Sequence, residues 1–222
     1  MTNQNSSGSA QGLHRYAALL AIAGAVAFLA LLTIVSFLEP QIRTAWDLVS
    51  DYELGSYGWI MRFAFFCFAI YSIAMFVALR PYVQTRKGRY GLLLLLIGGV
   101  IGGAGAGIFT TDPTYAQTST TIGDLHTLCG LTYILGFPIA ATFISRDLAA
   151  NSKWFAHRRW VNLVTILVWI GVAAFFLSSP PLVQGLVGYP NRYMVVIYQV
   201  WILVVAGLTW RLDKQNKGET KE

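Results

Sequence analysis

Six long apolar runs constrain this chain more than any other feature of its sequence. Each is close to the ~20 mostly apolar residues that cross a bilayer as a helix. They cover residues 16–38, 59–79, 91–109, 125–144, 160–177 and 193–210. A transmembrane β-strand would be about 10 residues long with alternating polarity, whereas these runs are continuously apolar. We therefore predict an all-α membrane protein built as a bundle of six transmembrane helices.

The scarcity of charged residues agrees with a lipid environment. Only 12% of the 222 residues are Asp, Glu, Lys or Arg, against about 25% in soluble domains. Residues 1–14 are polar and rich in Ser and Gly, so we expect them to form a disordered cytoplasmic tail. We expect a transmembrane domain over residues 15–211 and a second cytoplasmic tail over residues 212–222. Because the spans use nearly all of the chain, we expect no ATPase, kinase or nucleic-acid-binding module and no nucleic acid partner.

The Lys and Arg residues predict the orientation, because they favour cytoplasmic loops. With the N-terminus placed inside, three of the 16 lie on the outer side: Arg43, Arg62 and Arg192. The other thirteen lie on the inner side: Arg15, Arg80, Arg86, Lys87, Arg89, Arg146, Lys153, Arg158, Arg159, Arg211, Lys214, Lys217 and Lys221. We therefore predict that both termini are cytoplasmic.

The third apolar run is rich in glycine at four-residue spacing. The glycines are Gly98, Gly99, Gly102, Gly103, Gly105 and Gly107. Small residues at this spacing let helix backbones approach closely. Two interpretations stay open: tight packing inside the chain, or a homo-oligomer that forms through the Gly98–Gly107 face.

Polar side chains gather where the predicted spans meet the outer side. Those at or near the ends of spans are Asp51, Glu53, Arg62, Asp112, Asp124 and His126. Only the first outer loop has room for structure of its own, and its residues 40–51 are expected to form a short interfacial helix. The sequence therefore places one polar cluster at one end of the bundle.

Arg62 lies about one turn inside the second span, where an unpaired charge costs a few kcal/mol. We predict a direct or water-bridged pair with Asp51, Glu53 or Asp112, and we favour Asp112 because its helix end lies at the same depth. The pair is either structural or part of an arginine site that anchors a ligand such as a lipid phosphate.

His126 is the only histidine inside a predicted span. It is a hydrogen-bonded packing residue, an acid/base group, or a metal ligand that would need Glu53, Asp112 or Asp124 beside it. No metal-binding motif accompanies it, so we expect neither a metal nor another cofactor. Arg192 and Gln199 lie seven residues apart in the sixth span, hence on one helix face, and add a thin polar lining.

Several of these segments resemble the domain-of-unknown-function 998 family. They are residues 50–55, residues 58–62, the Phe109-to-Pro113 stretch with its Phe-x-x-Asp-Pro pattern, and Leu125-His126. The resemblance covers about residues 15–212. It implies a prokaryotic six-helix protein, hence a multi-pass protein of the bacterial plasma (inner) membrane, and it carries no assigned reaction. The matching polar positions are Asp51, Glu53, Arg62, Asp112 and His126.

Three functions are open at this stage. We favour binding of a lipid headgroup or a membrane partner, with these ligand-binding residues: Asp51, Glu53, Arg62, Arg192 and Gln199. The first alternative is an intramembrane lipid-modifying hydrolase in which His126 is the base and Asp112 or Asp124 orients it. A distant resemblance to hydrolases of the alkaline ceramidase type points the same way, although their additional histidines are lacking. The second alternative is a small transporter, which the apolar middle of the spans disfavours.

Overall fold

The computed structural model describes residues 4–178 and 186–219, and within these ranges it consists of helices and loops. Its longer helices are α1 (Gln4–Leu38), α2 (Gly58–Leu79), α5 (Thr121–Ala150), α6 (Arg158–Leu177) and α7 (Gly188–Glu219). The third span is a continuous rod of α3 (Arg86–Ile97), the π-helix η2 (Gly98–Gly103) and α4 (Ala104–Ile108). Two short 3-10 helices, η1 (Val49–Leu54) and η3 (Ser152–His157), lie in loops.

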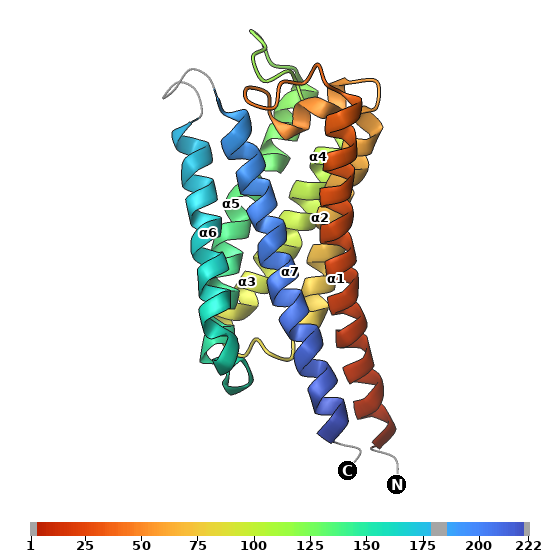
Figure 1. Ribbon diagram of the computed structural model, residues 1–222, viewed down its shortest axis with the longest axis vertical. Helices are drawn as coiled ribbons and strands as arrows, with labels where there is room; N and C mark the ends of the chain where they lie inside the picture. The colour runs from red at the N-terminus through yellow and green to blue at the C-terminus, as the bar shows by residue number, and fades with distance from the viewer. Residues whose placement is uncertain (1–3, 179–185, 220–222) are drawn as a thin grey trace.

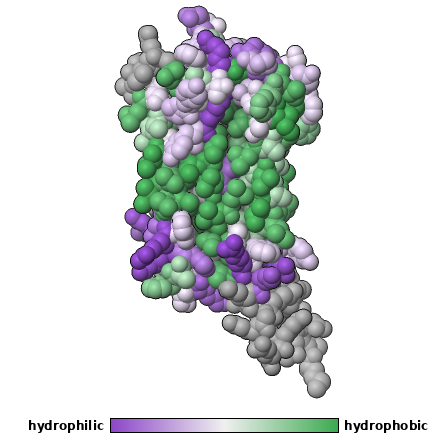
Figure 2. Space-filling view, viewed as in Figure 1, coloured by the Kyte–Doolittle hydropathy of each residue, from purple (hydrophilic) through white to green (hydrophobic). Residues whose placement is uncertain are grey.

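Six stretches in the described part of the chain are long and apolar enough to cross a membrane. Figure 2 shows an apolar band across the middle of the visible face, with hydrophilic residues gathered toward both ends. The prediction of an all-α bundle with six spans is confirmed, and the protein is a multi-pass membrane protein.

The contacts between the six spans close into a ring, and Figure 1 shows the spans running along the long axis of the molecule. Each span packs on the next one along the chain, and α7 packs back on α1. Aromatic rings fill the interior: Phe68 stacks on Tyr133 with centroids 4.4 Å apart, and Phe137 stacks on Tyr198 with centroids 4.1 Å apart. Helix α1 begins and α7 ends at the same end of the ring.

Several helices extend beyond the apolar runs that predicted them. Helix α1 begins at Gln4, so the described part of the expected first tail is helical, and residues 1–3 lie outside the described residues. Helix α7 continues to Glu219 and α5 spans Thr121–Ala150 where 125–144 was expected. Elongating a helix costs far less than nucleating one, so each helix continues into its polar flanks.

The glycines of the third span pack inside the chain. A Cβ at Gly99 would lie 2.6 Å from the carbonyl oxygen of Phe68 on α2, and one at Gly102 would lie 2.8 Å from that of Cys129 on α5. The close backbone approach expected from the sequence is therefore made to α2 and α5. The interpretation of tight packing inside the chain therefore accounts for Gly99 and Gly102.

The loop after α1, which we call the first outer loop because the sequence predicts it to lie outside, differs from the interfacial helix expected over residues 40–51. It makes turns as far as Leu48 and then enters η1. The guanidinium of Arg192 on α7 donates to the carbonyl oxygens of Thr44 (2.9 Å) and Asp47 (2.7 Å). These bonds satisfy two carbonyl oxygens of a loop that is not helical. The loop is thereby tied to α7, and η1 is placed beside the ends of the spans.

Candidate functional site

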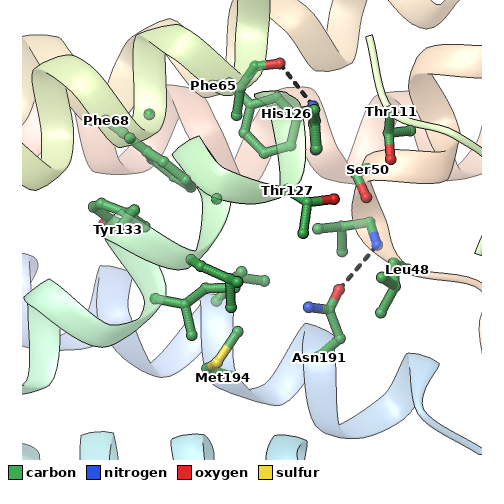
Figure 3. Close-up of a pocket in the computed structure, with 18 of the residues that line it drawn as sticks. Leu48, Ser50, Phe65, Phe68, Thr111, His126, Thr127, Tyr133, Asn191 and Met194 are labelled. Carbon is green, nitrogen blue, oxygen red and sulfur yellow. Dashed lines mark hydrogen bonds between the residues drawn. The ribbon is translucent and has the colours of Figure 1, made fainter. Parts of the chain in front are cut away.

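A cavity of about 160 Å³ lies near one end of the ring, which we call the predicted outer end and which carries loop residues 39–57 and 109–120. Its polar lining comes from η1, α5, α7 and the loop after α4: Ser50, Thr111, His126, Thr127 and Asn191. Figure 3 shows Ser50 and Thr111 toward one end of the cavity and the aromatic side chains Phe68 and Tyr133 toward the other. The cavity is therefore amphipathic.

One face of α5 forms a rim of this cavity. Thr127, Gly130, Leu131 and Ile134 follow an i, i+3, i+4, i+7 pattern, so they share a helix face, and all four line the cavity. Thr127 and Leu131 are exposed. Both residues belong to a membrane span, so the cavity reaches the lateral surface of the bundle.

His126 has one ring nitrogen engaged by the protein. Its Nδ1 lies 2.7 Å from the carbonyl oxygen of Phe109 and 3.1 Å from that of Ala106. Carbonyl oxygens only accept hydrogen bonds, so Nδ1 carries the proton. The neutral ring then has its lone pair on Nε2. In the described part of the chain, Nε2 has no hydrogen-bond partner.

Glu53 is the acid that lies beside His126. Its Oε2 is 3.6 Å from Nδ1 and accepts a hydrogen bond of 3.1 Å from the backbone N–H of Thr111. Its Oε1 is buried without a partner among the described residues. Burial raises the pKa of the Glu53 carboxyl to about 7, although the Thr111 N–H and the charge of Arg62 act in the opposite direction.

Arg62 does not make the direct pair that was favoured with Asp112. Its Nη2 donates to the hydroxyl oxygen of Thr110 at 2.6 Å, and no carboxylate oxygen of the described residues lies within 4.0 Å of it. Asp112 instead accepts from the N–H (2.6 Å) and hydroxyl (3.0 Å) of Thr120, at the start of α5. Backbone N–H groups before a helix lack helical partners, so they compete with Arg62 for this carboxylate.

The two acids expected to assist His126 are used elsewhere or exposed. Asp112 closes the loop before α5, and Asp124 is exposed in the first turn of α5, where the helix N-terminus favours a negative charge. The structure thus brings His126 together with Glu53. Within the described residues, no group of three His, Cys, Asp or Glu side chains is arranged to hold a metal ion.

The other predicted ligand-binding residues have protein partners. Asp51 accepts from the hydroxyl (2.5 Å) and the N–H (3.3 Å) of Thr114, and burial raises the pKa of its carboxyl. Arg192 holds the first outer loop and also donates to the hydroxyl of Tyr52 at 3.1 Å. Gln199 lies away from the cavity lining and donates to Tyr71 at 3.3 Å. Arg192 and Gln199 therefore contribute to packing around the site.

Asn191 is a site residue that the sequence did not indicate. Its side-chain oxygen accepts a hydrogen bond of 2.9 Å from the backbone N–H of Val49, which fixes the start of η1 on α7 (Figure 3). This bond orients the amide and leaves Nδ2 as a donor with no partner in the described ranges. The sequence shows only a polar residue between Pro190 and Arg192, so no local signal distinguishes it.

Comparison with known proteins identifies a family. The family model described as "Protein of unknown function (DUF998)" matches residues 22–208. No match was found among curated proteins or among solved structures. The matched range contains the cavity and every polar residue that lines it.

Proposed function

The chain belongs to the DUF998 family of proteins of unknown function, and we propose that it binds a membrane lipid in the cavity at its predicted outer end. The lipid's polar head would lie against His126 and Asn191, and the protein would act in the plasma membrane of a prokaryotic cell. The observation that carries this proposal is an amphipathic cavity that reaches the lateral surface of the bundle beside Thr127 and Leu131.

The size and the position of the cavity favour a lipid over a soluble ligand or a partner protein. Its volume of about 160 Å³ is close to that of the engineered ~150 Å³ cavity that admits benzene, so it accommodates one end of a lipid. The remainder of the lipid's hydrocarbon chain would lie in the bilayer, along the exposed face of α5. A stable protein interface needs about 800 Å² on each partner, which a cavity of this size does not provide.

Filling the cavity from α5 should remove the lipid. Gly130 lines the cavity, and a Cβ at this position meets no other atom within 4 Å. We expect Gly130→Phe to fold like the wild type, because the new ring has space available, and to lower lipid affinity at least about tenfold. Native mass spectrometry of the purified protein measures the bound fraction.

Gly136→Phe provides a matched control on the same helix. A Cβ at Gly136 has its nearest neighbour, the carbonyl oxygen of Leu94, at 4.0 Å, and this residue does not line the cavity. The control should keep its lipid and its melting temperature. Equal lipid retention by both variants, or equal loss, would show that the lipid is bound outside this cavity.

A further inference from the structure

Two buried side chains that line the cavity, His126 and Asn191, present free hydrogen-bonding groups of opposite kind. His126, only 7% exposed, offers an acceptor at Nε2 because the backbone holds the proton on Nδ1. Asn191, only 4% exposed, offers a donor at Nδ2 because its oxygen is bound to the Val49 N–H. Buried polar groups are costly to leave unpaired. A ligand that satisfies both groups must accept and donate a hydrogen bond.

The charges around the cavity disfavour an anionic ligand. No Lys or Arg of the described residues lines the cavity. Arg192, which follows the lining residue Asn191, donates to backbone carbonyl oxygens of the loop after α1. Arg62 donates to Thr110 and offsets the charge of Glu53. The Glu53 carboxyl lies 3.6 Å from Nδ1 of His126. A phosphate or carboxylate head would therefore be desolvated beside this acidic group without gaining a cation.

We infer that the ligand is an uncharged lipid with a free hydroxyl group, an inference that rests on the proposed lipid binding. The hydroxyl donates to Nε2 of His126 and accepts from Nδ2 of Asn191, and one oxygen atom supplies both functions. Its hydrocarbon chain packs against the aromatic and aliphatic lining that includes Phe68, Tyr133 and Met194. Long-chain alcohols and acylglycerols have this chemistry, whereas fatty acids and phospholipids with an anionic head do not.

Three probes that differ only in the head group test this inference: hexadecanol, hexadecanoate and hexadecyl phosphate. They are titrated into the purified full-length protein in an amine-oxide detergent, which itself has no hydroxyl group, and the complexes are counted by native mass spectrometry. We expect hexadecanol to bind about tenfold more tightly than either anion, because only the alcohol pairs both free groups without placing a charge beside Glu53.

The variant His126→Asn separates the recognition role of the ring from its structural role. An asparagine amide reproduces the Nδ1 donor that bonds to Phe109 and Ala106, but it has no group at the position of Nε2. The variant should keep the wild-type melting temperature, lose about tenfold in hexadecanol affinity, and bind hexadecanoate as before.

Two failures of this experiment are distinguishable. Equal binding of all three probes, each abolished by Gly130→Phe, would overturn the hydroxyl inference and leave lipid binding in place. If His126→Asn still binds hexadecanol more tightly than the two anions, the hydroxyl inference is likewise overturned and lipid binding is left in place. Absence of binding by any probe, together with no lipid difference between the Gly130→Phe and Gly136→Phe variants, would overturn the proposed function and the inference with it.

Discussion

Replacing Gly99 with alanine is expected to destabilise the bundle by about 2–3 kcal/mol. A Cβ at this position would overlap Oγ and Cβ of Ser72 and would lie 2.6 Å from the backbone oxygen of Phe68. The Ser72 hydroxyl can rotate away, but the Cβ of Ser72 and the Phe68 carbonyl are fixed to the backbone of α2, so the helices must move apart. The change should lower the melting temperature in detergent by about 5–10 °C.

The adjacent glycine provides the control for this experiment. A Cβ at Gly98 has its nearest neighbours at 3.8 Å, including Thr132 and Tyr133 of α5, which is ordinary van der Waals contact. Gly98→Ala should therefore melt close to the wild type. A similar melting temperature for Gly98→Ala and Gly99→Ala would contradict the close packing of η2 against α2.

The Glu53→Gln variant is expected to abolish much of the pH dependence of stability. Burial raises the pKa of the folded Glu53 carboxyl from its ordinary 4.5 to about 7. Between these two values the folded state holds a proton that the unfolded state has released. Stability should therefore be highest at or below about pH 4.5, fall as the pH rises toward 7, and level off above it. The total loss is up to about 3 kcal/mol.

Melting curves of the wild type and of Glu53→Gln at pH 5 and pH 8 measure this effect. Glutamine keeps the side chain uncharged, so the variant should resemble the wild type at pH 5 and melt at a higher temperature than the wild type at pH 8. A residual slope is expected from Asp51, whose carboxyl pKa is also raised by burial. Asp124→Asn, a change at an exposed acid, is the control. Parallel pH profiles for the wild type and Glu53→Gln would contradict the burial of Glu53 as a carboxyl with a raised pKa.

The sequence predicted the spans and the general place of the polar cluster, because both depend on local composition. Continuous apolar runs identify helices that must satisfy their own backbone hydrogen bonds in lipid. The positions of Glu53, Arg62 and His126 near the ends of those runs placed them at one end of the bundle. These inferences needed no knowledge of how the loops fold.

The partners within the cluster depend on loop geometry and were not predictable. Asp112 accepts a hydrogen bond from the N–H of Thr120, eight residues later in the chain. Glu53, which is distant in sequence, lies beside His126 because η1 places it there. The contact between Asn191 and Val49 joins residues 142 positions apart. At the other end of the ring, the buried Asp147 accepts from two backbone N–H groups that precede α3, each at 2.9 Å. Such long-range pairs leave no periodic signal in one sequence.

The most direct measurement of lipid binding in the cavity is photo-crosslinking with a long-chain alcohol that carries a diazirine near its hydroxyl group. Peptide mass spectrometry of the illuminated protein locates the adducts. Adducts should lie on the cavity-facing residues of α5 between 127 and 134 and at Met194 of α7, and Gly130→Phe should eliminate them. Adducts spread over the lipid-facing surfaces of α1 and α6, unchanged in Gly130→Phe, would contradict a lipid site in this cavity.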